Sequence, residues 1–300
     1  MIKSKYAFPA ACVLLLTGMW LSSCDEGTKK VFIRYKNVPG MITTFQQITR
    51  GLVKVEDRDS KRILQHEYME TTMDITNEVR RVLEDSTAEI MNSDKHQWRV
   101  RNMLDKSTTD TVLSKQTEGT PILEYMKPNG RMIDMEFASD TAKGNLDYLK
   151  EYYKQGFPVF PDAEVGQGYS WTQTTTVVLP DGPMEASTTY TIKSFARERG
   201  YDCAVIEYDG TCIIPLPPKD AKKYSIVSGV DKITSKGHLY FAYTEGILVS
   251  VKERYVLSSD RVLKESLTEP EEGYKPGQLV NINVGLEYDV DFYVTGLKMP

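Results

Sequence analysis

The clearest pattern in the chain is an alternation of apolar and polar residues near its C-terminus. From Ile282 to Val294 every even position is apolar, and Asn, Asp and Glu hold most of the odd positions. A period of two is typical of a β-strand with one face on a core and the other in water. The stretch Ile63–Ile75 repeats this period. Both stretches therefore predict long, half-buried strands.

Turn residues divide the chain into further strands. Asn129-Gly130 lies between two β-rich runs, and so does Thr244-Glu245-Gly246, which predicts two hairpins. Consecutive hairpins of this kind make an antiparallel meander. About a dozen strands are expected in all, and a sheet of that size tends to curl or close.

A third hairpin is predicted around Asp209-Gly210, a dipeptide typical of type I′ turns. This turn would set Glu207 opposite Cys212, with Cys203 four residues further along the same face. At about 3.3 Å per residue the two cysteines would be about 13 Å apart, whereas a disulfide needs Cα atoms within about 7 Å. The sequence therefore predicts two buried thiols rather than a disulfide.

One segment has helical rather than strand periodicity. Asp140 can cap a helix over Thr141–Lys154, in which Leu146, Leu149 and Tyr153 form one apolar stripe. A lone amphipathic helix in a β-rich chain is most simply placed against the concave face of a sheet. The predicted fold class is therefore mainly β: a large curved antiparallel sheet, a half-barrel or incomplete barrel, wrapping one central α-helix.

The stretch Phe160–Trp171, read F-P-D-A-E-V-G-Q-G-Y-S-W, separates this helix from the later strands. Pro158 stops the helix, and Gly166 and Gly168 permit a turn before the next strand begins. No residue-level repeat divides the chain. Residues 31–300 are therefore expected to form a single β-rich domain.

The N-terminus carries a membrane-targeting pattern. Two lysines precede the apolar run Ala7–Trp20, which is too short for a lasting transmembrane helix. Leu21-Ser22-Ser23-Cys24 then resembles a lipobox, at which a bacterial signal peptidase cuts before a cysteine that becomes acylated. The resemblance implies a signal peptide over residues 1–23 and a lipid anchor on Cys24.

Residues 24–30 would form the tether of such an anchored protein. Two or three acyl chains on one residue anchor a protein stably, where a single chain is marginal. Asp25 and Glu26 resemble a surface-export signal of some Gram-negative bacteria and an inner-membrane retention signal of others. The favoured location is the outer membrane, on either face. The alternative is an ordinary secretory signal with an incidental cysteine.

The stretch Phe160–Trp171 resembles a motif, F-P-x-x-x-V-x-x-G-x-x-W, that follows a helix in bacterial lipoprotein families of unknown function. More distantly, a curved antiparallel sheet around a helix is similar to the Lol-type half-barrel carriers of lipoproteins and lipids, which hold acyl chains between sheet and helix. That resemblance implies a ligand cavity lined by Leu146, Leu149, Tyr153 and Trp171. A lipid or another apolar or amphipathic ligand is the expected partner.

No catalytic or cofactor motif accompanies these patterns. His66-Glu67 begins like a zinc-protease motif, but Glu70 stands where the second histidine belongs, and the stretch has strand period. No metal and no cofactor are therefore expected, and the chain is interpreted as a non-enzyme. The formal net charge is −5, which argues against nucleic acid as a partner because phosphate binding needs a basic surface.

Three hydroxyl residues follow aspartates in a pattern that resembles the acceptor of bacterial O-glycosylation: Thr111, Thr141 and Ser86. Two further hypotheses of function stay open. One is a solid-core interaction module that acts through surface loops such as 105–119 and 267–277. The other is an enzyme whose site is assembled from residues far apart in the sequence.

Overall fold

The computed structural model describes residues 29–104, 111–113, 116–139, 150, 158–179, 182–216, 219–220, 224–265, 268 and 272–300. Within these residues the elements of regular secondary structure are β-strands, apart from the single helical residue Lys150. They are β1 (Lys30–Val31), β2 (Ile42–Asp57), β3 (Ile63–Val82), β4 (Ala88–Asn102), β5 (Thr111–Leu113), β6 (Thr117–Glu118), β7 (Ile122–Met126), β8 (Met132–Phe137), β9 (Val165–Gly166), β10 (Ser170–Leu179), β11 (Gly182–Glu198), β12 (Tyr201–Leu216), β13 (Lys219–Asp220), β14 (Tyr224–Ala242), β15 (Ile247–Glu265) and β16 (Leu279–Lys298).

Most of these strands form one continuous antiparallel path, in the order β10-β11-β12-β14-β15-β16-β2-β3-β4-β7-β8. Strands β5 and β6 pair with β4, β13 pairs with β14, and β1 and β9 form a separate pair. The C-terminal strand β16 pairs with β2, so that two meanders join in the middle of the sheet. The large antiparallel sheet predicted from the sequence is confirmed.

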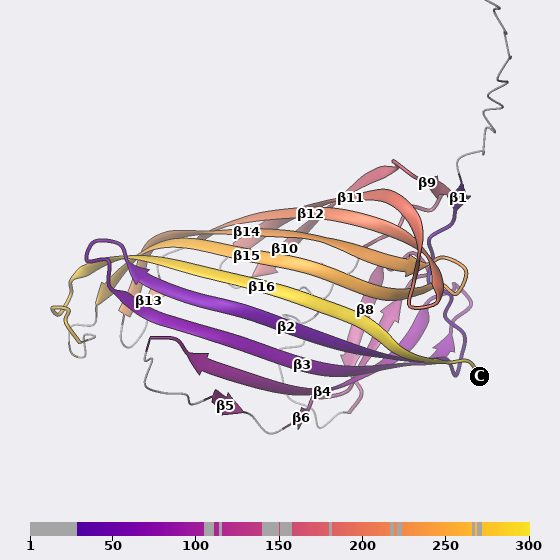
Figure 1. Cartoon of the computed structure of the whole chain (residues 1–300), viewed down its shortest axis with the longest axis horizontal. Helices are drawn as coiled ribbons and strands as arrows, with labels where there is room; N and C mark the ends of the chain where they lie inside the picture. The colour runs from indigo at the N-terminus through magenta and orange to yellow at the C-terminus, as the bar shows by residue number, and fades with distance from the viewer. Residues whose placement is uncertain are drawn as a thin grey trace, which may run out of the picture.

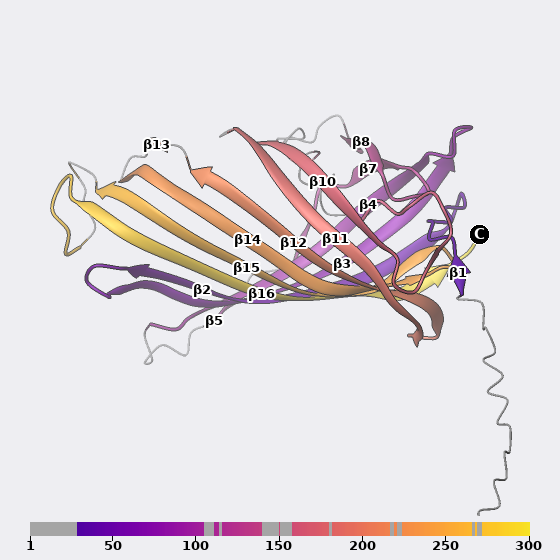
Figure 2. The same ribbon diagram turned by 90° about the horizontal axis from the view of Figure 1, so that it is seen from above.

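The sheet is curved and open at both edges. Figures 1 and 2 show that the edge strands β10 and β8 curl toward the same side of the sheet. We call this side the concave face and the opposite side the outer face. The path ends at β10 and β8 without pairing them.

The helix predicted over Thr141–Lys154 lies outside the described residues, except for Lys150. The Lys150 ammonium pairs with the Asp134 carboxylate on β8 at 2.7 Å. A central helix therefore stays a prediction, while the open antiparallel sheet is observed.

A buried core fills one end of the concave face, which we call the proximal end. Residues 31–36 and 158–166 pack there, linked to each other by the pairing of β1 with β9. Ile33, Phe160 and Val165 are buried against a set of sheet residues that includes Ile206 and Phe241. The ring centroids of Phe160 and Phe241 lie 4.8 Å apart. The motif at Phe160–Trp171 is thus structural. Its buried residues pack the segment between edge strands β8 and β10 onto the sheet.

Strand β12 is continuous, so the hairpin predicted at Asp209-Gly210 is wrong. Gly210 lies within this strand, and the crowding around it explains why a glycine is found there. A Cβ at Gly210 would lie 2.7 Å from the Ser235 hydroxyl and 2.9 Å from the Thr188 hydroxyl. Cys203 and Cys212 are nevertheless both buried and free, as predicted. The extended strand between them spans about 30 Å, so strand length, and not turn geometry, keeps the thiols apart.

Candidate functional site

Beyond the proximal core, two cross-strand rows of apolar residues lie on the concave face. The first row crosses β12, β14, β15, β16 and β2 and contains Cys212, Ile233, Leu257, Leu286 and Val53. The second crosses β15, β16, β2, β3 and β4 and contains Tyr255, Tyr288, Gly51, Met69 and Val100. We call these two rows the apolar surface.

The apolar surface is not sealed like the proximal core. Ile233, Leu257, Leu286 and Met69 all remain partly exposed, whereas core residues such as Phe241 are fully buried. Exposed apolar area in a contiguous patch is typical of a binding site.

A glycine in β2 lets an aromatic ring lie against this surface. Gly51 lies directly opposite Tyr288, and a Cβ at Gly51 would come within 1.9 Å of the tyrosine ring. The ring therefore covers the backbone of β2. The neighbouring ring of Tyr255 lies 6.2 Å away in a tilted arrangement. Two aromatic rings thus line the middle of the apolar surface.

The outer face of the same strands is charged. One cross-strand row there contains Asp209, Lys236, Arg254, Asp289, Arg50, Glu70 and Arg99. Lys236 pairs with Asp209 at 2.7 Å and Arg50 with Glu70 at 3.0 Å. Such exposed pairs add little stability, but they identify the outer face as the side in water.

A carboxyl group marks the boundary between the core and the apolar surface. Glu253 follows Tyr208 and Gly237 in one cross-strand row. A Cβ at Gly237 would lie 2.7 Å from the Tyr208 hydroxyl, so the missing side chain leaves room for that hydroxyl. Burial raises the pKa of the Glu253 carboxyl, and hydrogen bonds from the Tyr208 and Ser235 hydroxyls offset part of the rise.

A second polar group lies further along the concave face. The Arg261 guanidinium contacts both carboxylate oxygens of Asp231 at 3.3 Å. Its Nε donates to the Ser259 hydroxyl at 2.7 Å, and that hydroxyl donates to Asp231. Asp231 and Ser259 are buried. The apolar surface is therefore bordered by polar groups along β14 and β15.

The proximal core contains its own buried acid. Glu124 on β7 accepts a hydrogen bond from the Asn92 side chain at 3.3 Å. Burial raises the pKa of this carboxyl to about 7, and the hydrogen bond from Asn92 lowers it in part. The group is enclosed, so it belongs to the interior of the fold rather than to a solvent-facing site.

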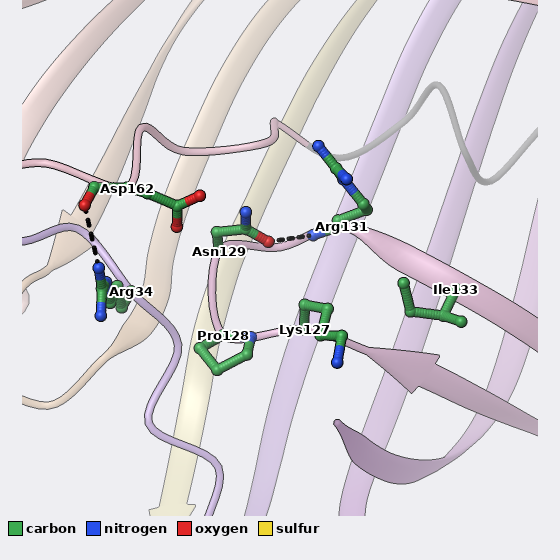
Figure 3. A pocket seen from close by; sticks show the side chains of 7 residues that line it. All are labelled: Arg34, Lys127, Pro128, Asn129, Arg131, Ile133 and Asp162. Carbon is green, nitrogen blue, oxygen red and sulfur yellow. Dashed lines mark hydrogen bonds between the residues drawn. The ribbon is translucent and has the colours of Figure 1, made fainter. Parts of the chain in front are cut away.

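A shallow pocket of about 300 Å³ opens at the proximal end (Figure 3). It is lined by Arg34, Lys127, Pro128, Asn129, Arg131, Ile133 and Asp162. Arg34 donates to the backbone carbonyl of Asp162 at 3.1 Å, and Lys127 pairs with Asp85 at 2.8 Å. Figure 3 shows Arg34 and Arg131 on opposite sides of the turn at Asn129. Three of the seven lining residues are cations.

The structure places only some of the sequence-predicted site residues. Trp171 lies at the proximal end of the concave face, stacked on Tyr190 with ring centroids 5.1 Å apart. Its buried indole N–H has no hydrogen-bond partner among the residues that the structure describes. Ser86 is exposed in a turn with φ of 66°, while Thr111 begins β5. The other predicted site residues lie outside the described residues: Cys24, Thr141, Leu146, Leu149 and Tyr153.

The described part of the chain contains neither a metal-binding cluster nor a membrane-spanning helix. No group of three or more His, Cys, Asp or Glu side chains there could hold a metal ion. No helix among the described residues is long and apolar enough to cross a membrane.

Comparisons with known proteins give a partial match. The model of a family of unknown function, DUF6263, matches residues 142–238. A search of the curated proteins gives no match. Among solved structures the chain is similar to lipovitellin, from a study of its lipid–protein interactions, with a TM-score of 0.47 and 11% identity over 88% of this chain. The chain spans about a quarter of that protein, 26% of its length.

Two bacterial structures also resemble the sheet. An outer membrane channel from Pseudomonas putida F1 gives a TM-score of 0.29 at 7% identity, over 87% of this chain and 97% of that one. OprB from Pseudomonas putida gives 0.23 at 7% identity, over 85% of this chain and 92% of that one.

Sequence patterns missed most of the apolar surface. The alternation in β16 indicates one apolar side, but the rows exist only once β16 pairs with β15 and β2. Gly51 and Gly237 give the one available signal, because a glycine within a strand often marks the close approach of another group.

Proposed function

We propose that this protein is a lipid-anchored, non-enzymatic protein of the cell envelope, and that its concave face binds the acyl chain of a lipid or another amphipathic ligand. One observation carries this proposal: most residues of the register-matched apolar rows stay partly exposed on one face, while the same strands are ion-paired on the other. An apolar ligand that covers these rows removes apolar area from water, which is favourable by about 25 cal/mol per Å².

The dimensions of the apolar face fit such a ligand. On β16 the concave-face residues from Ile282 to Phe292 are all apolar, a run of about 33 Å at 3.3 Å per residue. One bilayer leaflet has a hydrocarbon depth of about 15 Å, half of the usual 30 Å. A helix over 141–154 would be about 21 Å long and about 10 Å wide. Such a helix covers only part of a sheet whose strands lie about 4.8 Å apart.

The anchor is proposed on Cys24 in the lipobox-like stretch, with the outer membrane as the favoured location. Its test is the intact mass of the protein purified from its native host. A mass increase equal to two or three acyl chains, abolished by Cys24→Ser, supports the anchor. A mature chain without acyl mass refutes it.

Ligand binding is tested on the mature chain with Cys24→Ser, purified in mild detergent-free buffer and examined by native mass spectrometry and lipid extraction. Co-purified lipid is the expected result. The double variant Leu257→Gln/Leu286→Gln should retain at least tenfold less, because two adjacent leucines of the apolar surface become polar.

The matched control is Leu52→Gln/Ile213→Gln, which makes the same change at two exposed residues of the outer face. It should retain as much lipid as the parent. Circular dichroism and urea unfolding establish that both doubles are folded. If the parent carries no apolar ligand and binds none on titration, the solid-core interaction module replaces this proposal.

A further inference from the structure

The first described segment of the chain is amphipathic. In residues 30–36 the side chains alternate: Lys30, Phe32, Arg34 and Lys36 are exposed, while Ile33 is buried in the proximal core. The exposed set is three cations and one aromatic ring. We call Lys30, Phe32, Arg34 and Lys36 the cationic strip.

Within the described residues, the cations of the cationic strip form no ion pair with a carboxylate. Arg34 donates to the backbone carbonyl of Asp162 at 3.1 Å, and Lys36 donates to the backbone carbonyl of Thr244 at 2.6 Å. Both acceptors are neutral. Three cations without an ion pair among the described residues are notable in a chain whose formal net charge is −5.

Apolar groups accompany these cations. Phe32 is 46% exposed, and the Arg34 guanidinium lies 4.8 Å from the centroid of its ring. Ile133, which is 48% exposed, and Arg131 both line the pocket of Figure 3. The Arg131 guanidinium has no hydrogen bond or ion pair among the described residues. Exposed aromatic and aliphatic groups beside Lys and Arg are typical of surfaces that lie at a membrane interface.

The length of chain before this segment limits where the strip can lie. Only residues 25–29 separate Cys24 from Lys30, and a fully extended chain of that length reaches about 20 Å. An acylated Cys24 therefore holds the strip close to the headgroups of the bilayer that carries the acyl chains.

We propose that the cationic strip, together with Arg131 and Ile133, docks the proximal end of the protein on anionic phospholipid headgroups of the membrane in which Cys24 is anchored. The inference rests on the proposed anchoring, and it adds a specific contact surface and an orientation. Three cations near an anionic surface attract it over about one Debye length, roughly 10 Å. Phe32 and Ile133 then enter the interfacial layer.

The test uses the mature chain with Cys24→Ser, so that binding does not depend on acylation. Co-sedimentation is measured with vesicles of phosphatidylcholine alone and with vesicles of equal parts phosphatidylcholine and phosphatidylglycerol. We expect binding to the anionic vesicles that weakens with added salt. Lys30→Gln/Arg34→Gln/Lys36→Gln should weaken it about 100-fold, since each basic residue near the surface contributes about fivefold.

The matched control is Lys232→Gln/Lys236→Gln/Arg254→Gln, which removes three exposed cations from the outer face. It should bind as the parent does, and circular dichroism establishes that both triple variants are folded. Equal binding to neutral vesicles, equal loss in both triples, or no binding to any vesicle would each overturn the inference. Full displacement by inorganic phosphate would also overturn it, in favour of a free-phosphate site.

The outcome is separable from that of the proposed function. If the protein carries lipid on its apolar surface but does not bind anionic vesicles, the proposed function is supported and this inference is refuted. If it binds vesicles through the cationic strip but holds no lipid, this inference is supported and the proposed ligand binding is refuted.

Discussion

The buried carboxyl of Glu124 makes the stability of the fold depend on pH in a defined direction. It is 4% exposed, and burial raises its pKa from 4.5 to about 7. A group whose pKa is higher in the folded than in the unfolded chain stabilises the fold fully below the unfolded pKa. That contribution is lost as the pH rises through the folded pKa. The contribution of Glu124 should therefore disappear between about pH 4.5 and pH 7.

The perturbation is Glu124→Gln, which keeps the shape of the side chain and an oxygen that accepts from Asn92. A pKa rise from 4.5 to about 7 corresponds to about 3 kcal/mol between the two protonation states. At about pH 8 the wild type holds a buried carboxylate and the variant a neutral amide, so the variant should be more stable by about 3 kcal/mol. At about pH 4 both are neutral, and their free energies of unfolding should agree within about 1 kcal/mol.

The assay is urea unfolding of both proteins at the two pH values. Other titrating groups cancel in the difference between variant and wild type. Glu84→Gln removes the same charge from an exposed turn and should leave that difference near zero at both pH values. A Glu124→Gln variant that is less stable than wild type at pH 8, or equally shifted at both pH values, refutes the argument that burial controls this carboxyl.

Three further predictions test the packing. Phe160→Ala should lower the free energy of unfolding by about 3–5 kcal/mol, because the ring is enclosed in the proximal core. The control Phe32→Ala, at an exposed ring, should change it by less than about 1 kcal/mol. Equal losses of both variants in urea unfolding would contradict the core assignment. Gly51→Ala should lower the free energy of unfolding by about 1–3 kcal/mol, because the Tyr288 ring must move away from the new methyl group. The near-ultraviolet circular dichroism should change with it, and an unchanged spectrum would refute the contact. The Cys203 thiol is buried, and burial raises its pKa to about 12, so it should resist a thiol reagent until the protein unfolds; rapid labelling of the native protein would contradict this.

The local part of the fold could be predicted because it depends on residues adjacent in sequence. Asn129-Gly130 and Thr244-Glu245-Gly246 form the predicted turns, and their glycines have φ values of 86° and 71°. Asp209-Gly210 carries a similar signal, yet its glycine relieves a contact with side chains on two neighbouring strands. A dipeptide does not distinguish these two uses of glycine, because the crowding comes from distant parts of the chain.

Non-local pairing explains what the sequence could not supply. Alternation in Ile282–Val294 predicts an apolar side of β16, and that side is observed in the register with β15 and β2. The pairing of β16 with β2 joins the two ends of the chain, and no local pattern encodes it. The cationic strip is a similar case. Residues 30–36 alternate in the sequence, but only the packing of one side on the core shows that the cations are on the exposed side.

The distribution of polar groups along β15 favours an amphipathic ligand over a pure hydrocarbon. Glu253 and Ser259 both face the concave side, and Tyr255 and Leu257 lie between them on that side. The two polar positions are six residues apart, about 20 Å at 3.3 Å per residue, which exceeds the roughly 15 Å hydrocarbon depth of one leaflet. An acyl chain of that length therefore fits between them, and a polar end at either limit of the apolar stretch meets Glu253 or the Arg261 group. A wholly apolar molecule long enough to extend past either limit would desolvate a polar group without a hydrogen bond in return, which is unfavourable.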